Sequence, residues 1–83
     1  MYQIKLLPSA QRDLDDLPFT EFSRISARLK RLNHEPRPYG SVKLTGEEGY
    51  RLRIGHYRLL YRIADREKTV YVYRVKHRRE VYR

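Results

Sequence analysis

A two-residue break between two alternating segments constrains the fold of this chain more than any other feature of its sequence. Apolar or aromatic residues alternate with polar ones over residues 50–54 and again over residues 57–63, which is the period of a strand with one buried face. Gly55-His56 separates the two segments, and a two-residue loop that begins with glycine is typical of a type II′ hairpin. The sequence therefore predicts an antiparallel hairpin in which Ile54 lies opposite Tyr57.

The register of this hairpin sorts its side chains onto two faces. Arg53 is expected opposite Arg58, with Arg51, Arg62 and Leu60 on the same face. The other face should meet the helices, and it carries Tyr50, Leu52, Ile54, Tyr57, Leu59, Tyr61 and Ile63. Like charges directly opposite each other destabilise a sheet, whereas arginine forks match the oxygens of a phosphate. The pair therefore indicates an anion site, unless both side chains extend into screening solvent or acidic residues of a partner satisfy them.

The N-terminal half predicts a strand followed by two helices. Residues 2–7 alternate like a strand, and a proline ends them. Ser9 is a candidate N-cap for a helix from Ala10 to about Leu17, whose aspartates face mostly outward. A second helix is expected from about Thr20 to Asn33. Its apolar stripe consists of Phe22, Ile25, Leu29 and Leu32.

The C-terminal half changes to a period of two and predicts further strands at residues 42–44 and about 69–76. In the last strand, valines alternate with tyrosines, and the pattern leaves open which set faces the helices. The whole order predicts a single α+β domain over residues 1–83: an N-terminal strand, a two-helix hairpin, then a twisted, mostly antiparallel sheet of three to four strands with the helices on one face.

The charge of the chain favours a polyanionic partner. Nineteen Lys and Arg against ten Asp and Glu give a net charge of +9, and residues 43–83 carry twelve of those basic residues. Eight tyrosines accompany them and suit stacking on bases. Nucleic acid, an acidic protein or both would fit. The absence of cysteine and of any apolar run near the ~20 residues of a membrane span leads us to expect a cytoplasmic protein that does not bind membranes.

The candidates for chemistry are cations, one histidine and one tyrosine. No metal site or cofactor is expected, because the three histidines are far apart in the sequence and no carboxylate cluster accompanies them. No glycine-rich phosphate loop precedes a helix, and no motif marks a nucleophilic serine. The remaining set suits cleavage of RNA by its own 2′-hydroxyl, and it consists of Arg51, Arg53, Arg58, His77, Arg78 and Tyr82.

That reaction needs in-line geometry, stabilised charge on the phosphate, a base for the 2′-hydroxyl and an acid for the leaving 5′-oxygen. Arginine suits the second task, but it stays protonated and is a poor base. Proton transfer therefore falls to Tyr82 or His77, because neighbouring cations acidify a tyrosine and histidines titrate near neutral pH. The alternative for Tyr82 is an aromatic residue that packs on the core or belongs to a disordered end.

The chain resembles the RelE/ParE toxin superfamily over nearly its whole length. The matching segments are Lys43-Leu44-Thr45-Gly46, residues 50–61 and residues 75–82, together with the Pro8-Ser9-Ala10 opening and the two helices. RelE-like members are messenger-RNA endonucleases that act in the ribosomal A site, and an antitoxin protein neutralises them. The resemblance implies a metal-independent mRNA interferase of a type II toxin–antitoxin system, with a RelE-like fold.

The resemblance also assigns residues. Arg58 matches the central active-site arginine of the family, Arg78 its second arginine and Tyr82 its C-terminal tyrosine. His77 stands where the best-known member has a lysine, which gives it a share of the acid–base work. The residues expected to contact RNA are Lys43, Arg51, Arg53 and Arg62. Of these, the arginines at 51 and 53 also replace lysines of that member, so charge is kept while the ability to lose a proton is not.

Two other functions stay open at this point. ParE-like members share the fold and poison DNA gyrase, although they usually lack the arginine–tyrosine set. A non-catalytic RNA-binding module would bind RNA with a steep dependence on salt and leave it intact. The expected partners are the ribosome, mRNA and a cognate antitoxin, whose acidic and partly disordered segment would fold on the basic face of the toxin and form a hetero-oligomer with it.

Overall fold

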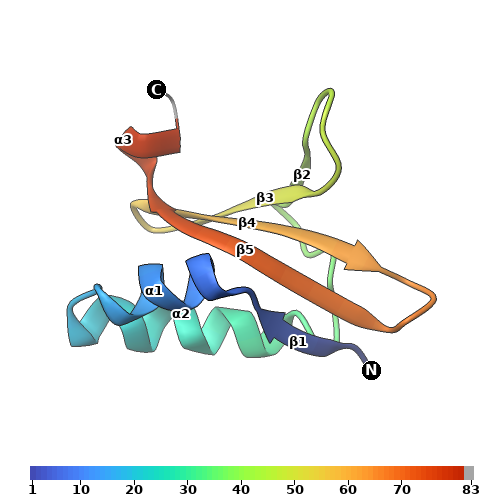
Figure 1. Cartoon of the computed structure of the whole chain (residues 1–83), viewed down its shortest axis with the longest axis horizontal. Helices are drawn as coiled ribbons and strands as arrows, with labels where there is room; N and C mark the ends of the chain where they lie inside the picture. The colour runs from blue at the N-terminus through green and yellow to red at the C-terminus, as the bar shows by residue number, and fades with distance from the viewer. Residues whose placement is uncertain (82–83) are drawn as a thin grey trace.

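The computed structural model describes residues 1–81, which form a five-stranded sheet with two helices against one face (Figure 1). The elements are β1 (Gln3–Leu6), α1 (Pro8–Asp15), α2 (Phe19–Arg31), β2 (Val42–Lys43), β3 (Tyr50–Ile54), β4 (Tyr57–Ala64), β5 (Thr69–His77) and α3 (Arg78–Val81). The strands lie in the order β1-β5-β4-β3-β2. α3 and the β2–β3 connection lie on the side of the sheet away from α1 and α2 (Figure 1). The predicted α+β architecture is confirmed.

β1 joins the edge of the sheet and runs parallel to β5. Gln3 lies opposite Thr69 and Leu6 opposite Val72, while the other described strand pairs are antiparallel. Parallel neighbours cannot be joined by a tight turn, and here the helices and the other three strands lie between them in the chain. The expected mostly antiparallel sheet is therefore present, and the N-terminal strand is its fifth member.

α1 covers the part of the β5 edge that β1 leaves open. Because β1 ends opposite Val72, the next residues of β5 have no strand on that side, and unpaired edge groups need other partners. The Ser9 hydroxyl donates to the Tyr73 carbonyl at 2.6 Å, and an Asp13 oxygen accepts from the Val75 N–H at 2.8 Å. The predicted N-cap role of Ser9 is wrong: the helix begins at Pro8 after the N-cap Leu7, and Ser9 binds the sheet instead.

Asp13 also receives the guanidinium of Arg74, with Nε at 2.8 Å and Nη2 at 3.1 Å. The sequence predicts that the aspartates of this helix face mostly outward. The Asp13 side chain is only 17% exposed and faces the sheet instead. Burial alone would raise the pKa of Asp13, but the hydrogen bonds from Arg74 and Val75 outweigh it and hold this pKa below its usual value.

Asp13→Asn is expected to lower the free energy of unfolding at neutral pH by about 1–2 kcal/mol, because it removes a charge-assisted interaction. Since the pKa of Asp13 is lower in the folded state, this stability is complete above the unfolded pKa of about 3.9 and is lost as the pH falls through the folded value. Urea titrations of both proteins from about pH 2 to pH 7 would measure it. An equal difference between the two proteins at both ends would contradict the assignment.

α2 supplies the central part of the helix layer. It begins after Pro18 and ends at Arg31, and Ile25, Leu29 and Leu32 are buried as predicted. Phe22, which was expected in the same stripe, is 36% exposed. The buried core between helices and sheet consists of Ala10, Leu14, Ile25, Leu29, Leu32, Leu52, Ile54, Leu59, Tyr61, Val70, Val72 and Val75.

The β3–β4 hairpin has the predicted register. Ile54 pairs with Tyr57, and Arg53 pairs with Arg58. Gly55 has a φ of 60° and His56 does not have a positive φ, which is the pattern of a type II′ turn. Most of the residues that alternate with the arginines are buried in the core: Leu52, Ile54, Leu59 and Tyr61. The others are partly buried against it: Tyr50, Tyr57 and Ile63.

A β-bulge in β5 settles which side chains of the last strand face the helices. Tyr61 pairs with Val72 and Leu60 with Arg74, so Tyr73 is an extra residue between two regular stretches. Before and after it, the valines at 70, 72 and 75 are buried. The extra residue shifts the alternation by one, and as a result Lys76 lies opposite Arg58.

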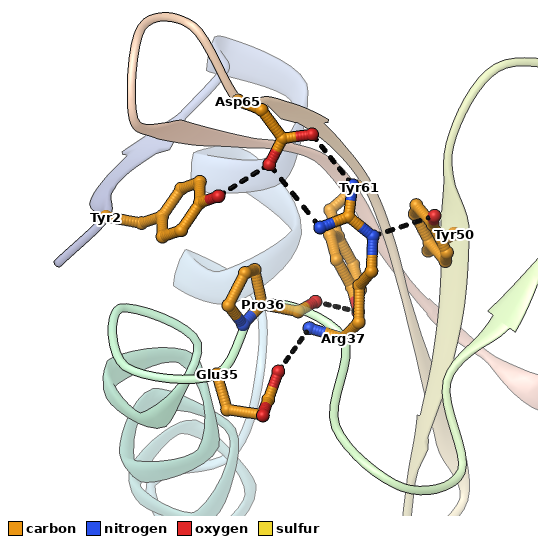
Figure 2. A network of polar contacts seen from close by, with 7 residues as sticks. All are labelled: Tyr2, Glu35, Pro36, Arg37, Tyr50, Tyr61 and Asp65. Carbon is orange, nitrogen blue, oxygen red and sulfur yellow. Dashed lines mark hydrogen bonds and ion pairs between the residues drawn. The ribbon is translucent and has the colours of Figure 1, made fainter.

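A polar network ties the α2–β2 loop to the sheet and to the N-terminus (Figure 2). The Arg37 guanidinium binds the Asp65 carboxylate at 2.9 Å and donates to the Tyr50 hydroxyl at 3.0 Å, while the Tyr2 hydroxyl donates to Asp65 at 2.5 Å. The hydrogen bonds from Arg37 and Tyr2 lower the pKa of Asp65. Close by, the buried Tyr61 hydroxyl donates to the Pro36 carbonyl at 2.9 Å, so the loop is fixed at two points.

Candidate functional site

Three cations line up across neighbouring strands on the sheet face away from α1 and α2. Arg53 of β3 pairs with Arg58 of β4, which pairs with Lys76 of β5. Directly opposed side chains on one sheet face have Cβ atoms about 4.5–5.5 Å apart, so three positive side chains emerge close together. We call Arg53, Arg58 and Lys76 the cation row. Such a row is costly in isolation and becomes favourable when an anion binds across it.

The members of the cation row differ in their surroundings. Arg58 is 7% exposed and is the one buried charged residue within residues 1–79. Arg53 is exposed, and its Nε donates to the Gly55 carbonyl at 3.1 Å, which directs its guanidinium toward the hairpin turn. Lys76 is half-buried. α3 lies next to β4 and β5, on the same side of the sheet as the row (Figure 1).

The other residues expected to contact RNA are more scattered. Arg51 pairs with Leu60 and shares the face of the cation row. Arg62 shares this face too, but its guanidinium lies 4.2 Å from the centre of the Tyr71 ring and 3.9 Å from the Glu48 carboxylate. Lys43 pairs with Tyr50, whose ring stacks on Tyr61 on the helix side, so the register places Lys43 on the opposite face.

The candidate catalytic residues near the C-terminus that the structure describes do not lie together either. His77 pairs with Tyr57, and its ring lies edge-on to the Tyr57 ring at 5.3 Å and 6.2 Å from the His56 ring. This contact places His77 on the face away from the cation row. Arg78 is exposed at the start of α3, where its backbone N–H donates to the His56 carbonyl at 2.7 Å. Tyr82 lies outside the described residues.

Tyr73 and Lys76 are two residues of this face that sequence patterns did not point to. The Tyr73 hydroxyl reaches across the sheet to Gly49 in the β2–β3 connection, where a Cβ would come within 3.2 Å of it. Burial raises the pKa of Tyr73, and the carboxylates of Glu47 and Glu48 add to this effect. The bulge at Tyr73 sets the position of both residues on this face. A bulge at a tyrosine cannot be predicted from the local sequence.

The cation row supplies positive charge and hydrogen-bond donors of the kind that an anion requires. Within residues 1–81, no three His, Cys, Asp or Glu side chains are grouped so that they could hold a metal ion. A cavity of about 500 Å³ lies among β1, α1 and α2, and no member of the cation row lines it. In the same part of the chain, no helix has the length and apolar character needed to cross a membrane.

The small mixed sheet with a two-helix hairpin on one face matches the fold of solved RelE-type toxins. Residues 4–82 match the family described as the ParE toxin of the type II toxin–antitoxin system parDE. Toxin RelG of Mycobacterium tuberculosis is 38% identical to this chain over 90 residues, which cover 99% of this chain and 97% of that protein. The chain belongs to this family of type II toxin–antitoxin toxins, and within it to the RelE type.

Solved structures of RelE-type toxins also match this chain. The toxin–antitoxin complex RelBE2 of Mycobacterium tuberculosis contains a chain with a TM-score of 0.83 and 34% identity, and the match covers 92% of this chain and 96% of that one. The isolated RelE toxin of Escherichia coli matches with a TM-score of 0.81 and 26% identity, over 99% of this chain and 92% of that one. The expected membership of the RelE/ParE superfamily is thus confirmed.

Proposed function

We propose that this toxin is a metal-independent endoribonuclease that cleaves messenger RNA on the ribosome and so stops translation. The observation that carries the proposal is the cation row, with Arg58 at its centre and Arg51 on the same face. Like charges side by side on one face of a sheet repel each other, and a polyanion that lies across them replaces this repulsion with attraction. Steered by the net charge of +9, RNA would approach this face quickly.

In the proposed reaction, the 2′-hydroxyl of the message attacks the adjacent phosphate. Arg58 and Arg53 contact the non-bridging phosphate oxygens and stabilise the charge that grows on them. Arg78 supports the leaving side from the start of α3. Tyr82 is the proposed base for the 2′-hydroxyl, and His77 is the second choice because its ring contacts Tyr57 on the other face.

The burial of Arg58 implies that RNA binding changes the site. At 7% exposure, its guanidinium is not open to a phosphate in the free protein. α3 is the neighbouring segment on this side of β4 and β5 (Figure 1), and a four-residue helix at the end of a strand is cheap to displace. We therefore propose that α3 moves when RNA binds on the ribosome.

A cognate antitoxin is the proposed partner that holds the toxin inactive in the cytoplasm. The chain is similar to toxins solved in complexes with antitoxins, among them RelBE2 of Mycobacterium tuberculosis and RelBE of Escherichia coli. An acidic antitoxin segment would be attracted to the same face of the sheet as RNA. Competition for the cation row is then the simplest means of inhibition.

Sequencing of transcript 5′ ends after induction of the toxin tests this function. We expect new ends inside coding regions, and we expect them to disappear when initiation of translation is blocked. The alternative is a ParE-like gyrase inhibitor, because the matching family is described as the ParE toxin of parDE. This alternative predicts intact messages and inhibition of supercoiling by purified gyrase. Intact transcripts during growth arrest would contradict the proposed function.

A further inference from the structure

Lys76 occupies a position in the site that only the three-dimensional register reveals. On one side it lies opposite Arg58, which in turn lies opposite Arg53. On the other side, β1 has already ended, and Asp13 of α1 binds Arg74 and the Val75 N–H. Lys76 is close enough to Asp13 to contribute to lowering the pKa of that carboxyl. Among the residues that the structure describes, the charged groups that these contacts place beside Lys76 are Arg58 within the sheet and the Asp13–Arg74 pair at its edge.

The chemistry of the cation row is incomplete without a group that exchanges protons. Arginine keeps its proton throughout the usable pH range, whereas a lysine ammonium can give one up. Of the three members of the cation row, Lys76 is the one with that ability. The ring of His77, the next residue, lies on the other face against Tyr57.

We propose that Lys76 is a catalytic residue, the general acid that protonates the leaving 5′-oxygen; this inference rests on the proposed RNA cleavage. The 2′-oxygen forms a bond to phosphorus and loses its proton to the base, Tyr82. The bond from phosphorus to the 5′-oxygen breaks, its electron pair stays on that oxygen, and the Lys76 ammonium supplies the proton. The products are a 2′,3′-cyclic phosphate and a 5′-hydroxyl, and Lys76 regains a proton from water.

Two features support an acid over a mere phosphate contact. An ammonium group carries protons that it can donate directly to a leaving oxygen. Arg58 and Arg53 already supply two planar forks for the non-bridging oxygens, and a compact ammonium beside them is better suited to a single oxygen atom. Arg53 and Lys76 lie on opposite sides of Arg58 in the register, so a phosphate bound at Arg58 would have one of them on each side.

Single-turnover cleavage of ribosome-bound message by Lys76→Ala and Lys76→Arg tests the inference with two substrates. One is the natural message, and the other carries sulfur in place of the scissile 5′-oxygen, because a thiolate leaves without a proton. We expect both variants to cleave the natural message about 10²–10³-fold more slowly. On the sulfur substrate, both should come within a few-fold of the wild-type rate, while Arg58→Ala should stay slow on both substrates.

The possible results distinguish failure of the Lys76 inference from failure of the proposed RNA cleavage. If Lys76→Arg keeps the wild-type rate on the natural message, or if the sulfur substrate rescues neither variant, Lys76 is not the acid, and the proposed function is untouched. If the wild-type protein leaves the natural message intact, the proposed function fails, and the inference fails with it. Thermal unfolding of each variant shows whether its fold is retained, and Lys76→Arg keeps both charge and length if Lys76→Ala does not fold.

Discussion

Arg58→Ala is expected to abolish growth arrest and to slow cleavage of ribosome-bound message by about 10²–10³-fold, the usual effect of removing one donor that stabilises transition-state charge. Arg58 is central in the cation row, with Arg53 on one side and Lys76 on the other. A phosphate held across the row would contact all three, and the loss of the central fork leaves the two others too far apart to grip the same oxygens. Single-turnover cleavage in vitro and growth after induction would measure the effect.

Two further variants separate lost chemistry from lost folding. Arg58→Met keeps the length and apolar stem of the buried side chain and removes its charge, so it should be as inactive as Arg58→Ala while unfolding at a temperature close to that of the wild type. Arg66→Ala removes the same charge from the exposed β4–β5 turn and should retain full activity. Toxic and folded Arg58 variants would exclude any catalytic use of this face.

Tyr61→Ala is expected to cost about 3–5 kcal/mol of folding stability, as large-to-small changes of buried aromatic residues do. Tyr61 is 0% exposed, and its hydroxyl donates to the buried Pro36 carbonyl at 2.9 Å. Burial raises the pKa of this phenol to about 12, so it remains a donor at every working pH. A chain of 83 residues has a total stability of about 4–12 kcal/mol, so this one change removes a large part of it.

Urea unfolding followed by circular dichroism would measure the loss, and Tyr61→Phe is the matched control. It keeps the ring in the core and leaves only the Pro36 carbonyl without its partner, so we expect it to cost about 1–2 kcal/mol. Equal losses for Tyr61→Ala and Tyr61→Phe would mean that the hydrogen bond to the loop, and not the packing of the ring, dominates the role of Tyr61.

The hairpin could be predicted from the sequence because its register depends on local chemistry alone. A glycine at the first position of a two-residue loop favours a type II′ turn, and the face of each strand residue then follows by alternation. The pairing of Arg53 with Arg58 is therefore a direct consequence of the turn residues and the strand period. The presence of the two helices could also be predicted from the sequence. Apolar residues three and four apart, such as Ile25 and Leu29, are buried together on one face of a helix.

The parts that could not be predicted depend on contacts distant in the sequence. Serine is a residue type that is typical of N-caps. Ser9 instead donates to the Tyr73 carbonyl of β5, 64 residues away, because β1 ends before it can pair with that carbonyl. The bulge at Tyr73 inserts one residue without any glycine to signal it. It alone decides that Lys76, and not His77, shares a face with Arg58.

The same contacts connect the stability of the fold to the geometry of the site. Asp13 binds Arg74 and the Val75 N–H just after the bulge, and Lys76 is the next residue of the strand. α1 thus helps to fix the register that completes the cation row. We expect changes at Asp13 to affect both acid stability and cleavage, whereas changes in the Arg37–Asp65 network at the far end of β4 should affect the fold alone.

The chemical ends left on a ribosome-bound message after treatment with the purified toxin test the central claim most directly. Attack by the 2′-hydroxyl on a phosphate held by the cation row predicts a 2′,3′-cyclic phosphate on the upstream fragment and a 5′-hydroxyl on the downstream one. A message that stays whole with toxin in excess over ribosomes, or fragments that carry a 3′-hydroxyl and a 5′-phosphate, would contradict it.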